Sequence, residues 1–139
     1  MITNLNGQVE NILLSELKKA LPEYDVESFP TKFENYTFTS PNGCVLVKYV
    51  KTSFSQQNTI WNVTQDSTIK FSIIAGFRGL NEYSQLHEPL QKIKEVLTGL
   101  EIAGRKVFLT DEQFLAEINT DLYCGITLNI NLWQEERKD

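Results

Sequence analysis

The sequence has little of what most catalytic and membrane-bound proteins require. One histidine and two cysteines occur in 139 residues, which excludes schemes that need several imidazoles as bases or metal ligands. No run of about 18 consecutive apolar residues occurs, and the start lacks a cationic stretch followed by an apolar block. We therefore expect a cytosolic protein with neither a signal peptide nor a membrane-spanning helix.

Concentrated positive charge is also missing. The formal net charge is -5, the pI is near 4.9, and the basic residues occur singly or in pairs along the whole chain. A surface that binds the phosphates of DNA or RNA would have to form against the average field of the molecule. We therefore expect no specific binding of nucleic acid.

The residues that could carry chemistry do not form a recognisable constellation. Cys44 and Cys124 lie in apolar, strand-like runs, where a free thiol behaves as a small buried hydrophobe. No nucleophile elbow, phosphate loop or calcium loop occurs, and "GFRGL" lacks the spacing of a dinucleotide fingerprint. We predict no catalytic residue, no cofactor and no metal; a small enzyme that uses Cys44 or Cys124 stays open as an alternative.

The first half of the sequence predicts one helix followed by about three strands. Apolar residues recur at three- and four-residue spacing from Leu5 to Leu21, and Pro22 ends this pattern. The run Cys44 to Val50 is apolar on both faces, which indicates an interior strand. We read the polar segment from Lys51 to Asn62 as a loop, and Val63 to Leu80 as a long central strand.

The second half predicts a helix and three strand-like runs. The helix follows a cap at Asn81 or Ser84, and it either kinks at Pro89 or begins near His87. The runs "KVFLT", "QFLAEI" and "LYCGITLNINLW" follow, with a tight turn at 119–121 and a solvated tail at 135–138. The predicted fold class is α+β: a single domain, 1–139, in which two helices pack on a largely antiparallel β-sheet.

Three residues are candidates for a contact surface. Phe54 lies inside the polar segment and Trp61 at its far end, where aromatic side chains either fold back onto the core or anchor an interface. Arg78 stands between two glycines at the end of the central strand. It either forms an intramolecular salt bridge or offers its guanidinium to a carboxylate or phosphate elsewhere.

The order of several short motifs resembles a known family. "SPNGCVLVKYV" is followed by "VTQDSTIKFSIIAGFRGL", a helix that ends in "LTGL" and a closing strand "YCGITLNINL". This pattern is similar to the gene product thirty-seven family of Mu-like bacteriophages and prophages, over nearly the whole chain. Two departures are Ser40, where the family commonly has histidine, and a more polar segment between Phe54 and Trp61.

The resemblance implies a structural role in a phage tail. It implies a tail terminator, also called a tail completion protein, that forms a hexameric ring, caps the tail tube and joins it to the head. The expected partners are further copies of the chain, the tail tube protein and a head-completion protein. The implied location is the virion tail, and the host cytoplasm during assembly. A non-enzymatic adaptor of similar fold, acting as a monomer or dimer, stays open as an alternative.

Overall fold

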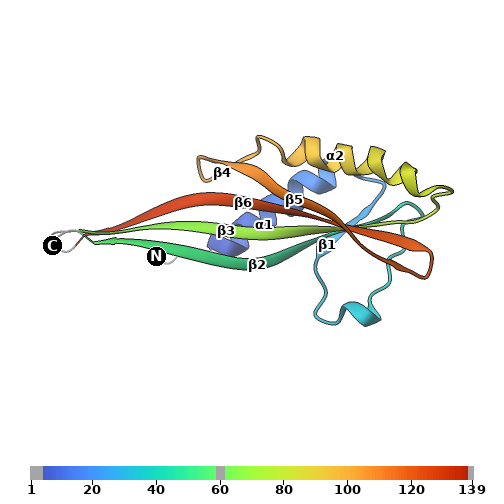
Figure 1. Ribbon diagram of the computed structural model, residues 1–139, viewed down its shortest axis with the longest axis horizontal. Helices are drawn as coiled ribbons and strands as arrows, with labels where there is room; N and C mark the ends of the chain where they lie inside the picture. Colours follow the sequence, from blue (N-terminus) through green and yellow to red (C-terminus); the bar gives the residue numbers. More distant parts are fainter. Residues whose placement is uncertain (1–4, 59–61, 138–139) are drawn as a thin grey trace.

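A computed structural model describes residues 5–58 and 62–137, and the surroundings of side chains are described for 5–54 and 67–131 (Figure 1). The fold is α+β, as predicted, with one sheet and two α-helices. The elements are α1 (Leu5–Ala20), β1 (Asp25–Ser28), η1 (Phe33–Asn35), β2 (Gly43–Asn58), β3 (Asn62–Phe77), η2 (Tyr83–Leu86), α2 (His87–Leu97), β4 (Glu101–Ile102), β5 (Arg105–Ile118) and β6 (Asp121–Arg137).

The sheet has six strands in the order β1-β2-β3-β6-β5-β4. The short β1 runs parallel to β2, and the other neighbours are antiparallel. β3 lies in the middle between β2 and β6, so the prediction of a central strand is confirmed, although the strand ends at Phe77 rather than Leu80.

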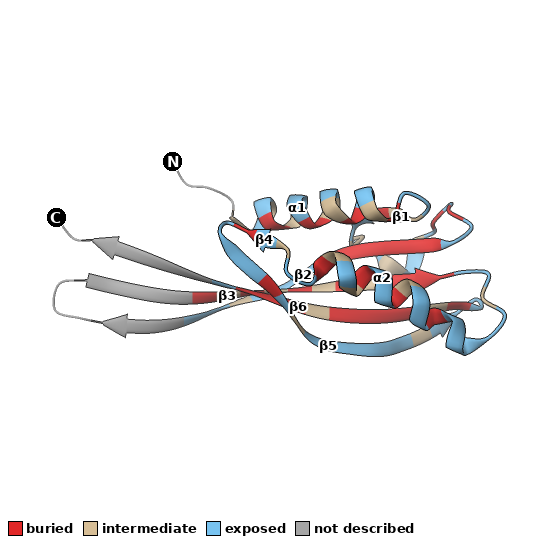
Figure 2. Ribbon diagram, turned by 90° about the horizontal axis from the view of Figure 1, so that it is seen from above, coloured by how far each residue is buried: buried red, intermediate tan, exposed pale blue. Residues whose placement is uncertain are grey.

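Both α-helices pack on the same face of the sheet and enclose the main core (Figures 1 and 2). Each helix contributes its apolar stripe, and β3 contributes every second side chain, as the periods of helix and strand require. The buried residues are Val9, Leu13 and Leu17 from α1, Leu90, Ile93 and Leu97 from α2, and Ile69, Phe71, Ile73, Ala75 and Phe77 from β3. Removal of this apolar surface from water stabilises the fold.

The other face of the sheet carries a smaller aromatic cluster. The connection between β1 and β2 crosses this face, and its Phe29 and Phe33 rings stack with their centroids 5.3 Å apart. Phe33 also meets the ring of Tyr123 edge to face at 5.5 Å. Tyr123 in turn lies so close to Gly76 that a Cβ there would be 2.6 Å from the ring. The cluster therefore covers one end of the face that carries no α-helix.

The segment 51–62, predicted to be a loop, is mostly strand. β2 continues to Asn58 and pairs with β3 as far as Asn58↔Val63. β6 adds a third strand, because Asn62 lies opposite Arg137. We call these parts of β2, β3 and β6 (53–58, 62–68 and 131–137) the arm, which projects beyond both helices (Figure 1). The prediction was wrong because a sheet that stands away from the core needs no apolar face, so polarity does not exclude a strand there.

Two further predictions are corrected in the second half. "KVFLT" and "QFLAEI" belong to one strand, β5, whose register against β6 shifts between Leu109 and Asp111 and again between Phe114 and Ala116. Each β-bulge resets the alternation of side chains, so the sequence reads as two runs. The expected solvated tail begins inside β6, which runs to Arg137.

The second helix resolves the ambiguity at Pro89. α2 begins at His87, and Pro89 therefore lies in its first turn, where a missing N–H leaves no helical hydrogen bond unmade. The 3₁₀ turn η2 precedes it and is closed by a capping box between Glu82 and Gln85.

Candidate functional site

Arg78 follows β3 directly and connects three segments of the chain. Its Nε and Nη2 donate hydrogen bonds to the two carboxylate oxygens of Asp121, at 3.1 and 2.9 Å. Its Nη1 donates to the carbonyl oxygen of Phe38 at 3.4 Å, and the guanidinium lies 3.9 Å from the centre of the Phe38 ring. Hydrogen bonding to Asp121 raises the pKa of Arg78. A planar, two-pronged contact of this kind fixes orientation as well as charge.

The partner of Arg78 is placed by a tight turn. Asn119 and Thr120 have φ values of 52° and 70°, and they join β5 to β6 immediately before Asp121. The turn predicted at 119–121 is therefore confirmed. The Asp121 side chain is only 8% exposed, whereas that of Arg78 is 41% exposed. The ion pair thus closes the fold at this end of the sheet and still leaves part of the guanidinium accessible.

The sequence reading missed both partners of Arg78. Asp121 was assigned only to a turn, and Phe38 was not singled out. A carboxylate just after a predicted turn is a weak signal, because many turns contain aspartate for local hydrogen bonding. The ion pair between Arg78 and Asp121 forms because β3 and β6 are neighbours in the sheet, and strand order cannot be deduced from the sequence pattern.

The two aromatic candidates have different outcomes. Phe54 lies on β2 at the base of the arm and is 63% exposed. Of the two alternatives for this residue, the one in which its ring folds back onto the core is therefore wrong. Trp61 lies outside the described residues. The structure therefore does not bring Phe54 and Arg78 together into one site: Arg78 follows the far end of β3, beyond the pair Gly43↔Phe77, whereas Phe54 lies opposite Ser67.

The two thiols are buried, as the sequence predicts, and they face different clusters. Cys44 belongs to the aromatic cluster and Cys124 to the main core, and both are free. Burial raises the pKa of Cys44 to about 12 and also raises the pKa of Cys124. At neutral pH both groups are therefore neutral thiols, which are poor nucleophiles.

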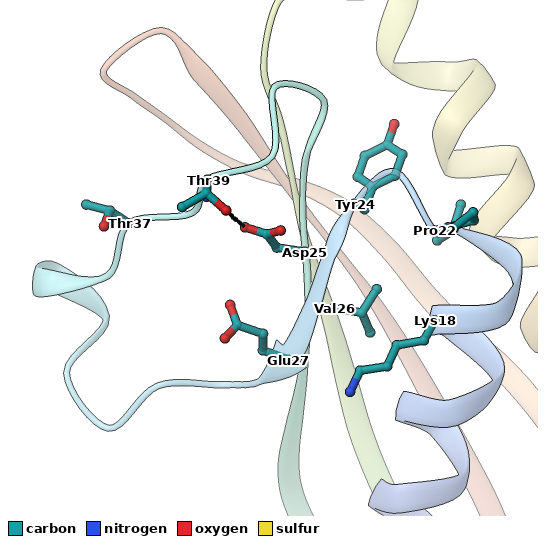
Figure 3. Close-up of a pocket in the computed structure, with 9 residues that line it drawn as sticks. Lys18, Pro22, Tyr24, Asp25, Val26, Glu27, Thr37 and Thr39 are labelled. Atoms are coloured by element: carbon teal, nitrogen blue, oxygen red, sulfur yellow. Dashed lines mark hydrogen bonds between the residues drawn. The ribbon is translucent and has the colours of Figure 1, made fainter.

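A groove of about 590 Å³ lies beside the short edge strand β1 (Figure 3). The end of α1 forms one wall and the segment that carries Thr37 and Thr39 forms the other, with β1 between them. The lining residues are Lys18, Leu21, Pro22, Tyr24, Asp25, Val26, Glu27, Thr37 and Thr39.

The carboxylates in this groove are engaged within the protein. Asp25 accepts hydrogen bonds from the backbone N–H of Thr39 at 2.7 Å and of Ser40 at 3.2 Å. Burial acts to raise the pKa of Asp25, but these hydrogen bonds outweigh it and lower the pKa. Glu27 accepts a hydrogen bond from the Tyr36 hydroxyl at 2.6 Å. These carboxylates hold the β1–β2 connection in place.

The side chains that commonly bind metal ions stay dispersed in the part of the chain that the structure describes. Three or more histidine, cysteine or carboxylate side chains do not gather there in a way that could hold a metal ion. Neither described α-helix has the length and apolarity that a membrane crossing requires.

The fold and these contacts define a small α+β protein with one twisted sheet, helices on one face and a projecting arm. Residues 13–139 match the family model described as Gp37 protein, and the chain belongs to that family. It is a family of phage proteins. A comparison with curated proteins gave no match.

Proposed function

We propose that this protein is a tail terminator: a structural subunit that forms a hexameric ring, caps the phage tail tube and joins it to the head. The observation that carries the proposal is the match of residues 13–139 to a phage protein family. The subunit would act in the virion tail, after assembly in the host cytoplasm. Its partners would be further copies of the chain, the tail tube protein and a head-completion protein.

The contacts of the reactive side chains support a structural rather than an enzymatic role. The thiols are buried and neutral, and Arg78 and the groove carboxylates have partners within the protein. Alkylation under native conditions tests the cysteine-enzyme alternative. We expect Cys44 and Cys124 to react slowly in the folded protein and rapidly in urea; rapid modification of one thiol in the folded protein would favour the enzyme.

Native mass spectrometry over a concentration series tests the proposal directly. The protein is measured alone and after mixing with the tube protein encoded beside it. A hexamer, either alone or induced by the tube, supports tail termination. A monomer or dimer that ignores the tube would instead favour the adaptor of similar fold.

A further inference from the structure

The two outer sides of the sheet have strand edges that no other strand covers within the described residues. On one side, β1 pairs with β2 only from Cys44 to Val47, so the outer edge of β2 is free from Lys48 onward. On the other side, β4 pairs with β5 at Arg105 and Lys106, and the N–H of Val107 donates to the carbonyl oxygen of Leu100 at 2.7 Å. No strand covers the outer edge of β5 from Phe108 onward within the described residues. Unpaired N–H and C=O groups along such edges readily accept another strand.

The exposed apolar residues concentrate on these same two strands. Among the side chains that the structure describes, the large exposed hydrophobic residues on β2 are Tyr49, Val50 and Phe54, and those on β5 are Phe108, Phe114, Leu115 and Ile118. The remaining two are Ile12 on α1 and Tyr83, whose ring contacts Phe114 at 5.6 Å. Exposed apolar groups gathered along two open edges indicate surfaces that bind protein.

The two edges also carry opposite charge. Lys48 and Lys51 lie on the free part of β2, and neither takes part in an ion pair among the described side chains. Asp111 and Glu117 lie exposed on β5, and they too have no such partner there. From the alternation of each strand, Lys48, Lys51 and Asp111 occupy the sheet face away from the helices, whereas Glu117, opposite Leu122, lies on the face that carries them.

The strand directions allow the two edges to meet in a repeating way. β2 is antiparallel to β3, β3 to β6, and β6 to β5, so β5 runs antiparallel to β2. When a second copy lies beside the first in the same orientation, β5 of one copy runs antiparallel to β2 of the other. The helix-covered faces of the two sheets then lie on the same side. Such a contact uses a different surface on each partner, which is what a closed ring requires.

We propose that the free edge of β5 in one copy pairs with the free edge of β2 in the next copy, so that the sheet continues from subunit to subunit. This inference rests on the proposed ring and names its contact. Within one copy, Val107 is level with Thr52 through Ile130 and Ile69, and Glu117 is level with Gly43 through Leu122 and Phe77. The free part of β5 therefore lies level with the first half of β2, whereas most of the free edge of β2 lies beyond Thr52. Neighbouring copies are therefore staggered along the strands, as in a sheet that closes on itself.

Reversal of charge tests this pairing. One variant carries Lys48→Glu and Lys51→Glu on β2, and the other carries Asp111→Lys and Glu117→Lys on β5. Each variant alone places like charges across every contact, and we expect it to need at least tenfold more protein to assemble. In an equimolar mixture, every contact again joins opposite charges if the two variants alternate. We expect the mixture to form rings with equal numbers of each, measured by native mass spectrometry with tube protein present.

A matched control for the β2 variant carries Lys18→Glu and Lys32→Glu, which change the net charge by the same amount at exposed positions outside the free parts of β2 and β5. This control should assemble like the unaltered protein. Normal assembly of either edge variant, loss in the control as well, or no recovery in the mixture would overturn the pairing while the ring itself stands. An unaltered protein that never assembles, even with the tube, would contradict the ring and the pairing together.

Discussion

The guanidinium of Arg78 and the carboxylate of Asp121 form a two-pronged ion pair between residues 43 positions apart in the chain. The pair ties the residue after β3 to the first residue of β6, and it anchors the Phe38 ring beneath the same guanidinium. The sequence leaves the role of Arg78 open between an intramolecular salt bridge and an outside contact. The structure shows the intramolecular salt bridge.

Replacement of this arginine tests the structural contact. Arg78→Ala leaves the nearly buried Asp121 carboxylate without its partner, so we expect a lower melting temperature with the fold retained. Lys92→Ala, which breaks the exposed pair with Glu23, serves as the control and should have almost no effect. The double variant Arg78→Ala/Asp121→Ala should lose less than the sum of the two single changes. If the stability losses of the two single variants simply add in the double variant, Arg78 and Asp121 do not stabilise one another. A folded Arg78→Ala that also fails to form rings would extend the role of Arg78 to the subunit contact.

Two phenylalanines on neighbouring strands separate core packing from surface contact. Phe71→Ala removes a fully buried ring from the main core and should lower the free energy of unfolding by about 3–5 kcal/mol. Phe54→Ala removes a ring that is 63% exposed and should change it by no more than about 0.5 kcal/mol. Urea denaturation of the monomer measures both. A loss at Phe54 similar to that at Phe71 would contradict its placement on the surface.

Gly43 is expected to tolerate no side chain. Its φ is 144°, and a Cβ there would lie 1.9 Å from the carbonyl oxygen of Gly76 in the adjacent strand. Gly43→Ala should therefore lower the free energy of unfolding by more than about 2 kcal/mol. Gly104 has a similar backbone constraint, at φ 76°, but open space around it, so Gly104→Ala should lose only about 1–2 kcal/mol. Equal losses in thermal denaturation would show that steric contact adds nothing at Gly43.

Stability should fall at alkaline pH. Burial raises the pKa of Cys44 to about 12 and that of Tyr123 to about 12, and the pKa of Tyr36 is raised by burial and by its hydrogen bond to Glu27. An unfolded thiol ionises near pH 8.5, about three units lower, so the unfolded state loses protons first. The stabilisation is complete below about pH 8.5 and is lost as pH rises toward 12. Urea denaturation between pH 7 and 10 should show this fall, and Cys44→Ala should make it shallower. An unchanged slope in that variant would remove Cys44 as a cause.

Some elements were predictable because their signal is local. The stripe of Val9, Leu13 and Leu17 repeats with the period of a helix, and Pro22 ends it wherever the helix packs. The alternation of Ile69, Phe71 and Ile73 likewise predicts a half-buried strand without knowledge of its neighbours. The turn begins at Asn119, a residue type that adopts positive φ more readily than most.

The arm and the long β5 were missed because their signals are not local. β2 beyond Thr52 is polar, and only its backbone pairing with β3 makes it a strand. The bulges of β5 break the alternation on which a sequence reading depends. The exposed Phe108 and Phe114 resemble core residues in the sequence, since apolarity alone does not say whether a neighbouring strand will cover them.

The sequence by itself determined the fold class, the two helices, the central strand and the apolar setting of Cys44 and Cys124, because these follow from periodicity and composition along the chain. The tertiary structure alone decided which strands are neighbours. Strand order brings Asp121 to Arg78, leaves β2 and β5 at opposite edges, and sets their opposed directions. These features arise from contacts between distant segments, and such contacts depend on how the whole chain buries its apolar surface.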